Sequence, residues 1–564
     1  MERLRETMTT THAPARPQTR PGFFRSEDGS LIIFGLMIFI LMLTVGGLAV
    51  DFMRYEAQRA RLQSTLDRAV LAAASLDQTL DPEDVVLDYF EKAGLGAYID
   101  REDITVYDDN FSRRVFAADV DMRIDTTLLK FSGIEELVAP SQGAAEEATS
   151  LTEISLVVDV SGSMGWSSAS GRSKIEELRR AARKFVNIVL CDPANPDSTT
   201  NCTVEEGTVS VSIVPYSEQV LVGDTILSEF NVTNEHDDST CVTFDASDFN
   251  STAITTSQQL QRTGHFDPWS SSSRSARSWT CATNSWREIT PISGSISDLH
   301  SHINSLGASG NTSIDLGIKW GAALLDPEFQ SVTANLNQDG VIADLFEDRP
   351  HSWTKRGLEK VIVLMTDGVN TDQHYLYDGF RSGPSPVYRN VLSDGSLGDR
   401  YSIYDADNDR YYWEYTGTWE DHPYGTGTYE ECGWEYVRTG WRSGYWDWQC
   451  NDVDEQGDDA QQLSYPELWK EKPWRWYDQF GWLDNQGNEY GNSTKNSRLQ
   501  AQCTAAKNEG MVIFTIGFET SSSSATVMRN CASSDAHHFN ANGLNLADAF
   551  SAIAREISKL RLIN

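Results

Sequence analysis

Residues 154–163 read Ile-Ser-Leu-Val-Val-Asp-Val-Ser-Gly-Ser, and they are the most informative stretch of the chain. An apolar run rich in β-branched residues ends in the carboxylate of Asp159, and two hydroxyls, Ser161 and Ser163, follow at alternate positions. This pattern predicts a buried strand that carries oxygen donors at its carboxyl end. A donor set without thiolate or imidazole suits a hard divalent cation such as Mg²⁺. The simpler alternative is that Asp159 and Ser161 only cap a turn or the next helix.

Two later segments carry polar residues that complete this pattern. Gly310-Asn311-Thr312-Ser313 precedes a helical pattern, and the apolar run at 361–365 ends in Thr366-Asp367-Gly368. Asp-x-Ser-x-Ser, a later loop threonine and a later Thr-Asp-Gly, in this order, resemble the metal-ion-dependent adhesion site of von Willebrand factor type A (VWA) domains.

The VWA resemblance implies an α/β fold with a Rossmann-like, doubly wound and mostly parallel sheet, and a metal at the carboxyl ends of the strands. It implies that Ser161, Ser163 and Thr312 ligate the ion directly, whereas Asp159 and Asp367 act mostly through water. The expected ion is Mg²⁺, with Mn²⁺ or Ca²⁺ as alternatives. A cation held mainly by neutral hydroxyls can take a carboxylate from a partner, so the resemblance implies binding and not catalysis.

The composition excludes one class of partner. The chain has 564 residues and a formal net charge of −36, from 46 basic and 82 acidic side chains. This length is enough for two or three domains with large cores. Such an acidic surface repels phosphate groups, so we exclude nucleic-acid binding.

Residues 31–50 are uncharged and mostly apolar, and about 20 such residues cross a bilayer as a helix. A cleaved secretory signal is the alternative, but Asp51-Phe-Met-Arg54 stands where a cleavage site with small residues should follow. We predict a single-pass anchor whose helix continues through residues 59–74. Residues 22–76 resemble the N-terminal segment of TadE/TadG-like proteins of the Tad (Flp) pilus assembly system, which implies a bacterial inner-membrane protein with a pilus-related role.

The cysteines predict the orientation of the chain. All eight follow the predicted span, so the bulk of the chain should lie in the oxidising periplasm or at the cell surface. Cys-x-x-Cys spacing is missing, which favours disulfides over a metal or redox site. Eight cysteines allow 105 pairings and the sequence does not choose among them. Pairing of neighbours would join Cys191 to Cys202, Cys241 to Cys281, Cys432 to Cys450 and Cys503 to Cys531.

The hydrophobic patterns divide the chain into four parts. We predict a cytoplasmic tail at 1–29, the membrane and TadE/TadG-like helix at 30–76, a small α+β spacer at 77–150 with a small-residue linker at 140–145, and a VWA domain at 151–564. Within the VWA domain we expect helices near 174–190, 296–306, 499–508 and 544–560, and strands at 209–216 and 511–517. Two long insertions, at about 220–295 and 370–495, interrupt it.

The second insertion is rich in aromatic residues and acids. It holds ten of the 16 tryptophans and 24 acidic against 10 basic residues, and it follows directly after the predicted ligand Asp367, so it should emerge at the metal face. Its rings either form a small core stapled by Cys432 and Cys450 or make an exposed recognition surface. The candidates for partner binding are Trp434, Trp441, Trp446 and Trp448.

An acidic run at 405–409 leaves an irregular Ca²⁺ site open, although it lacks the glycine and the glutamate of an EF-hand.

These patterns predict a membrane-anchored protein that is not an enzyme and that captures an acidic group of a protein partner, a pilus or envelope component, through its ion. The aromatic insertion would select the partner. One alternative is a surface adhesin or lectin that binds glycan through the aromatic insertion and holds a structural ion. A metal-dependent hydrolase is a third hypothesis, but it needs a base near the ion, and the sequence offers no candidate.

Overall fold

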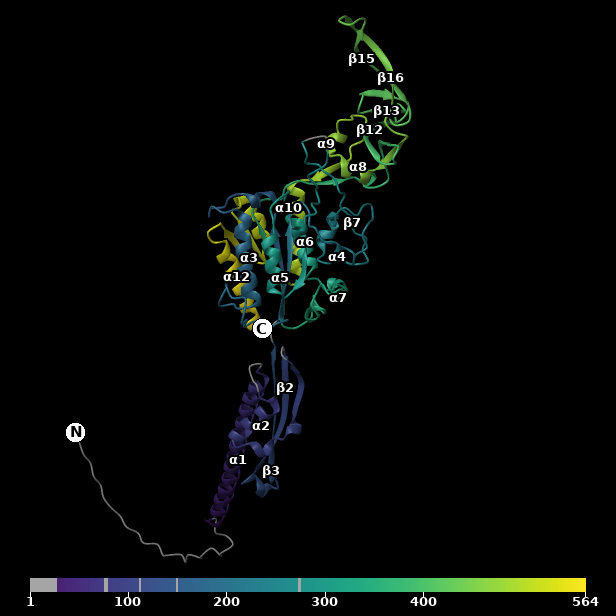
Figure 1. The fold of residues 1–564 in the computed structure, drawn as a ribbon. Coiled ribbons are helices and arrows are strands. Elements are labelled where there is room, and N and C mark those ends of the chain that lie inside the picture. Colours follow the sequence, from purple (N-terminus) through teal and green to yellow (C-terminus); the bar gives the residue numbers. More distant parts are fainter. Residues whose placement is uncertain (1–27, 76–79, 111–112, 149–150, 272–274, 564) are drawn as a thin grey trace, which may run out of the picture. The chain divides into compact units, whose positions relative to one another are not determined.

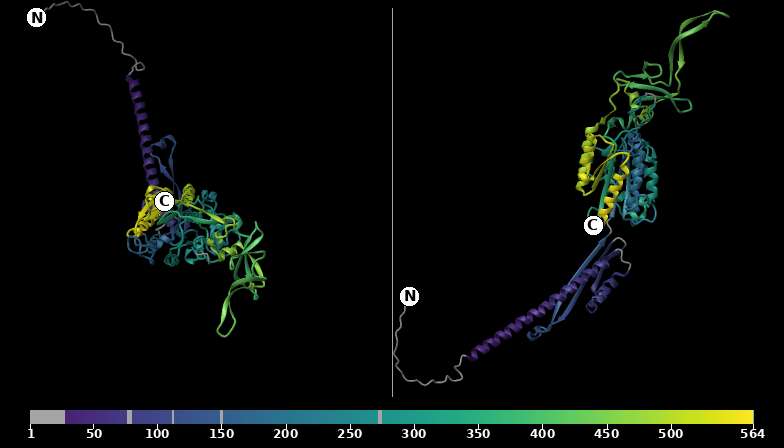
Figure 2. Two further views of the ribbon diagram at one scale, coloured as in Figure 1. Left: turned by 90° about the horizontal axis from the view of Figure 1, so that it is seen from above. Right: turned by 90° about the vertical axis from the view of Figure 1, so that its left-hand side faces the viewer.

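The computed structural model describes residues 28–75, 80–110, 113–148, 151–271 and 275–563 (Figures 1 and 2). The chain divides into two compact units, Met1–Ala148 and Thr149–Asn564. The predicted cytoplasmic tail lies outside the described residues except for its last two, which begin the first helix.

One long helix, α1 (Asp28–Ala74), runs through the first unit without a break. It is long and apolar enough to cross a membrane. Most described side chains of residues 31–50 are exposed, whereas Leu62, Leu66 and Val70 are buried. The helix therefore has an uncovered apolar half and a half that packs against protein, as the sequence predicts for an anchor that continues out of the membrane.

A three-stranded antiparallel sheet and a short helix pack against the half of α1 that follows the apolar stretch, and all of them share one core. Their bounds are α2 (Pro82–Lys92), β1 (Ile104–Asn110), β2 (Arg113–Asp125) and β3 (Glu136–Ala148). The predicted linker at 140–145 is wrong, because these residues lie inside β3 and pair with β2. Their small size has another cause: a Cβ at Gly143 would lie 3.0 Å from Leu66 Cγ, so small residues let α1 approach the sheet closely.

The second unit is built on a six-stranded sheet in the order β20-β19-β9-β4-β5-β8. All its pairings are parallel except that of the edge strand β8 with β5. Strands buried on both faces need continuous apolar runs, which explains the sequences of β4 and β9. The bounds are β4 (Leu151–Asp159), β5 (Val209–Tyr216), β8 (Thr290–Ser293), β9 (Leu358–Thr366), β19 (Val512–Phe518) and β20 (His538–Ala541).

Helices pack on both faces of this sheet (Figure 1), so alternate residues of one strand enter different cores. Val157 of β4 belongs to one core, and its neighbours Leu156 and Val158 belong to the other. The helices on the Val157 face are α6 (Ile314–Ala323), α7 (Gln330–Gln338), α10 (Asn492–Asn508) and α11 (Ser522–Cys531). Those on the opposite face are α3 (Lys174–Leu190), α5 (Ile296–Ser305) and α12 (Leu546–Ile563). The mixed α/β class agrees with the prediction.

The first insertion is mostly irregular and contains α4 (Asp224–Leu227), β6 (Val242–Thr243) and β7 (Gln261–Arg262). The edge strand β8 falls inside the predicted range 220–295 but belongs to the main sheet. Four disulfides cross-link the unit: Cys191–Cys202, Cys241–Cys281, Cys432–Cys450 and Cys503–Cys531.

The second insertion has a sheet of its own and a separate core, to which Phe266 of the first insertion also belongs. Its five-stranded antiparallel sheet has the order β14-β13-β12-β11-β17, and Trp413, Trp469 and Trp476 are buried in the insertion. The strands are β11 (Pro384–Val391), β12 (Leu397–Asp405), β13 (Arg410–Trp413), β14 (Thr418–Glu420) and β17 (Asp459–Ser464). The remaining elements are β10 (Gln373–Leu376), which pairs with β18 (Gly487–Tyr490), the helices α8 (Tyr465–Glu471) and α9 (Trp474–Tyr477), and the hairpin of β15 (Thr428–Arg438) and β16 (Gly444–Asp454).

Candidate metal centre

The carboxyl ends of β4 and β9 bring Asp159 next to Thr366. The two strands pair in parallel with Val158 opposite Met365, so the residue that follows each lies at the same edge of the sheet. Asp159 is fully buried; one of its oxygens accepts the Ser161 N–H at 2.8 Å and the other accepts the Thr366 hydroxyl at 2.8 Å. Both oxygens are thus fixed by protein groups.

Ser161, Ser163 and Asp367 extend this cluster. The hydroxyl oxygens of Ser161 and Ser163 lie 3.2 Å apart, and Ser163 Oγ donates to Asp367 Oδ1 at 2.6 Å. Asp367 is 5% exposed. Four of the five predicted metal residues therefore form one hydrogen-bonded group, although Asp159 and Asp367 are far apart in the sequence.

The loop that carries Thr312 lies next to this cluster. The Gly162 N–H donates to Gly310 O at 2.8 Å, and the Ser309 N–H donates to Val160 O at 2.9 Å, so the loop before α6 lies against the Ser161–Ser163 turn. Thr312 is 5% exposed and its N–H donates to Thr371 Oγ1 at 2.8 Å. Among the described residues, no hydrogen bond joins the Thr312 side chain to the other four.

Two carboxylates in one buried site need positive charge. Burial, and secondly the nearby charge of Asp367, raise the pKa of Asp159 to about 7. One ammonium, that of Lys174, lies 2.9 Å from Asp367 Oδ2. The hydroxyl and carboxylate oxygens gathered here, those of Asp159, Ser161, Ser163 and Asp367, are the donor types that a hard divalent ion prefers. Such an ion, when bound, would supply a Lewis-acid centre for an oxygen ligand.

Sequence reasoning missed two supporting residues, Lys174 and Lys495, and it gave Thr366, part of the Thr-Asp-Gly motif, no role at the site. Lys174 is the first residue of α3, where a positive charge is unfavourable because of the helix dipole. A lysine at this unfavourable position was the one sequence feature that could have pointed to an acidic neighbour. Lys495 is fully buried, so burial lowers its pKa to about 8. Its ammonium donates to Thr312 O at 2.7 Å and to Thr371 O at 2.7 Å, which fixes the Thr312 loop. Its position at the end of the predicted insertion gave no local signal.

Two other acidic groups have simpler explanations than metal binding. Glu430 lies near Cys432 and Cys450, but the two sulfurs form a disulfide and offer no thiolate. The run at 405–409 is the turn between β12 and β13, where Asp405 Oδ1 accepts the N–H groups of Asp407 and Asn408.

The four predicted partner-binding tryptophans all lie on the β15–β16 hairpin and are exposed: Trp434 by 62%, Trp441 by 89%, Trp446 by 63% and Trp448 by 54%. The hairpin extends beyond the strands of the five-stranded sheet (Figure 2). Trp434 pairs with Trp448 and Tyr436 pairs with Trp446 across the two strands, so the rings of these three tryptophans and of Tyr436 lie on one face together with the disulfide. Trp441 lies in the turn between the strands.

The opposite face of the hairpin is mixed. It carries Glu431, Glu435 and Asp447 together with Tyr429, Val437 and Tyr445, and Tyr445 is 54% exposed. Some aromatic rings of the second insertion thus lie in a buried core, and others are exposed on this hairpin.

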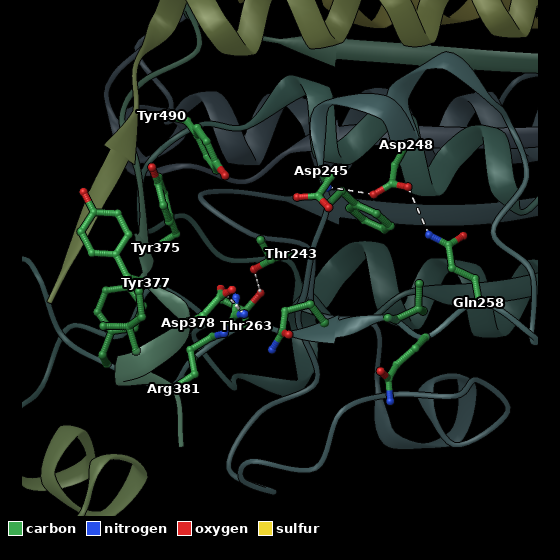
Figure 3. Close-up of a pocket in the computed structure, with 17 residues that line it drawn as sticks. Thr243, Asp245, Asp248, Gln258, Thr263, Tyr375, Tyr377, Asp378, Arg381 and Tyr490 are labelled. Atoms are coloured by element: carbon green, nitrogen blue, oxygen red, sulfur yellow. Dashed lines mark hydrogen bonds and ion pairs between the residues drawn. The ribbon is translucent and has the colours of Figure 1, made fainter. Parts of the chain in front are cut away.

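Two of the pockets in the described residues lie where the insertions meet each other or other parts of the second unit. One of about 310 Å³ is lined by residues that include Asp245, Gln258, Tyr375, Arg381 and Tyr490 (Figure 3). The other, of about 660 Å³, lies beside the loop before α6, because Gly310 and Asn311 line it together with Trp269, Trp279, Arg277 and Arg287.

The N-terminal segment of the chain matches a known protein family. Residues 29–76 match the family model "Putative Flp pilus-assembly TadE/G-like". This match confirms the resemblance of the Tad-like segment and relates it to pilus assembly. Among curated proteins, none matches the sequence significantly.

Similar solved structures include three pilus proteins. They are the vWF domain of the type V pili tip protein Mfa5 from Porphyromonas gingivalis (14% identity, 73% of this chain and 97% of that chain, TM-score 0.31), the pilus adhesin SpaC from Lactobacillus rhamnosus GG (13%, 82% and 34%, TM-score 0.28) and the minor pilin PilB from Streptococcus sanguinis (12%, 82% and 78%, TM-score 0.26). At these TM-scores the similarity supports no conclusion about the function of this chain.

Proposed function

We propose that this chain is a membrane-anchored Tad (Flp) pilus assembly protein whose second unit is a VWA-type domain that binds an acidic group of a protein partner through a divalent ion. The observation that carries the proposal is the hydrogen-bonded cluster of Asp159, Ser161, Ser163 and Asp367 at the carboxyl ends of β4 and β9. The ion is Mg²⁺, with Mn²⁺ or Ca²⁺ as alternatives, and the role is binding rather than catalysis.

The proposed location is the bacterial inner membrane, with α1 as a single span and residues 149–564 in the periplasm or at the cell surface. Four disulfides support an oxidising compartment for the second unit. The match of residues 29–76 supports a pilus or envelope component as the partner.

Residues beside the site favour an acidic partner. Arg277 and Arg287 line the pocket of about 660 Å³ next to the Gly310 loop, and Arg287 is 4% exposed. Its guanidinium donates to Ser217 Oγ at 2.6 Å and to Ser309 O at 3.0 Å, and neither acceptor is a carboxylate. One carboxylate, that of Glu218, lines the same pocket, so the two arginines leave an excess of positive charge. This excess favours a partner that carries further acidic residues around the one that meets the ion.

The test measures Mn²⁺ binding to the disulfide-intact full chain by electron paramagnetic resonance. We expect Ser163→Ala and Thr312→Ala each to weaken Mn²⁺ binding by at least about tenfold, a loss of about 1.4 kcal/mol. Ser297→Ala changes an exposed serine of α5 and serves as the matched control. Unchanged affinity in both site variants, with circular dichroism like that of the control, would contradict the metal site.

The partner is sought separately. A photo-crosslinker at Trp441, which is 89% exposed, is activated in envelope fractions with and without a chelator. A crosslinked envelope protein that disappears with the chelator supports ion-dependent capture. One that persists separates partner binding from the ion.

The exposed aromatic face of β15–β16 favours a second candidate, glycan binding with a structural ion, because free indole rings stack on sugars as well as on proteins. In that case Trp434→Ala and Trp448→Ala abolish binding on a glycan array, and Ser163→Ala retains it.

A further inference from the structure

The loop that joins β2 to β3 is apolar and exposed in a strongly acidic chain. Residues 126–134 read Thr-Thr-Leu-Leu-Lys-Phe-Ser-Gly-Ile; they contain no acid and one base, and acids flank them at 125 and 135. Phe131 is 89% exposed, Leu128 41% and Ile134 43%. Single exposed apolar residues are common, but three in one acid-free loop form a patch that calls for a partner.

Hydrogen bonds fix this loop to α1 where the apolar half of the helix ends. Asp51 is 3% exposed, and its carboxylate accepts the N–H groups of Thr127 at 3.1 Å, Leu128 at 2.6 Å and Leu129 at 2.7 Å. Arg54 donates to the Thr127 hydroxyl at 2.6 Å. The loop therefore has a defined position along the helix.

The contact of Leu128 with α1 shows where along the helix the loop lies. A Cβ at Gly47 would lie 2.7 Å from Leu128 Cδ1, so the leucine lies on the bare backbone of α1 at that glycine. Gly47 is still inside the apolar stretch 31–50, roughly 5 Å from its end at 1.5 Å per residue. Phe52, 59% exposed, and Arg54 follow directly, and aromatic and basic residues are typical of the membrane–water interface.

We propose that the β2–β3 loop lies in the interfacial layer of the bilayer that α1 spans and contacts phospholipid. Phe131 and Ile134 enter the boundary of the acyl chains, and Lys130 meets the headgroup phosphates. The loop surface is continuous with the lipid-facing surface of α1 through the contact of Leu128 with Gly47, which favours lipid over a protein partner. The loop gives the first unit a second membrane contact that limits rotation and tilt of the anchor.

The experiment uses the full chain in liposomes of phosphatidylethanolamine and phosphatidylglycerol. The photoreactive residue p-benzoylphenylalanine replaces Phe131 in one variant, Val45 of the apolar stretch in a second, and Leu71 in a third. Leu71 is the matched control, because it is 65% exposed and lies on α1 about 30 Å beyond residue 50. After irradiation, mass spectrometry identifies the adducts.

We expect phospholipid adducts at positions 131 and 45 and none at 71. The inference rests on α1 spanning a membrane, and position 45 tests this separately. Adducts at 45 but none at 131 overturn the loop contact and leave the anchor intact, whereas their absence at both positions overturns both. An adduct of 131 with protein in place of lipid, either a second copy or another chain, also overturns the inference.

Discussion

At the scale of single residues, Lys174 supplies a positive charge next to the proposed metal site. Its ammonium lies 2.9 Å from Asp367, and both side chains are nearly inaccessible. A divalent ion at the same carboxylate would be repelled by this ammonium. We expect Lys174→Met to strengthen Mn²⁺ binding by about tenfold, or about 1.4 kcal/mol, in a calorimetric titration. Lys184→Met, on the same helix at a more exposed position, should leave the affinity unchanged; weaker binding in Lys174→Met would show that the lysine supports the ion.

A second residue, His265, should make stability depend on pH. It is 9% exposed, its ring stacks on Trp279 at 4.1 Å, and burial lowers its pKa to about 4. Between pH 6.5 and 4 the His265 ring is therefore protonated in the unfolded chain but neutral in the native state. The free energy of unfolding then falls as the pH falls, by roughly 3 kcal/mol at most. His265→Phe keeps the stack and removes the titration. Its melting temperature should drop less than that of the wild type between pH 7 and 4.5, and an equal drop would contradict the assignment.

At the scale of elements, α6 positions the Thr312 loop because two glycines let it approach the sheet. A Cβ at Gly321 would lie 2.4 Å from Val157 Cγ2, and one at Gly317 would lie 2.5 Å from the Tyr216 ring. Alanine favours a helix by about 1 kcal/mol over glycine, but overpacking costs typically 1–3 kcal/mol. We expect Gly321→Ala to destabilise the second unit in a urea titration and to weaken Mn²⁺ binding. Gly481→Ala, where the new Cβ meets nothing within 4 Å, is the control and should change neither.

The elements also show how far the sequence could be read. The central strands β4 and β9 and the polar residues at their carboxyl ends were predictable, because a strand buried on both faces has a continuous run of apolar residues in the sequence. Residues 140–145 of β3 resemble a linker in composition, because Gly143 allows a close approach to Leu66 that only the fold reveals. The same holds for Lys495, which fixes Thr312 from a distant part of the chain. Local patterns predict elements, whereas contacts between distant segments need the structure.

At the scale of the whole molecule, two disulfides stabilise different parts of the second unit: one lies in the core and the other in the β15–β16 hairpin. The Cys503–Cys531 disulfide is fully buried and joins α10 to α11 against the main sheet. The Cys432–Cys450 disulfide is exposed and joins directly opposed residues of β15 and β16. An isolated two-stranded hairpin is marginally stable in water, so this cross-link must supply much of its order.

Removing each disulfide should therefore have a different effect. For the 18-residue separation of Cys432 and Cys450, chain entropy gives a contribution of about 3 kcal/mol to the hairpin alone. We expect Cys432→Ser with Cys450→Ser to leave the melting temperature of the second unit unchanged but to speed proteolysis within residues 433–449. Cys503→Ser with Cys531→Ser should lower the melting temperature and leave the hairpin resistant. If the first pair of substitutions lowers the melting temperature as much as the second, the hairpin is coupled to the core, and its aromatic face is not an independent binding arm.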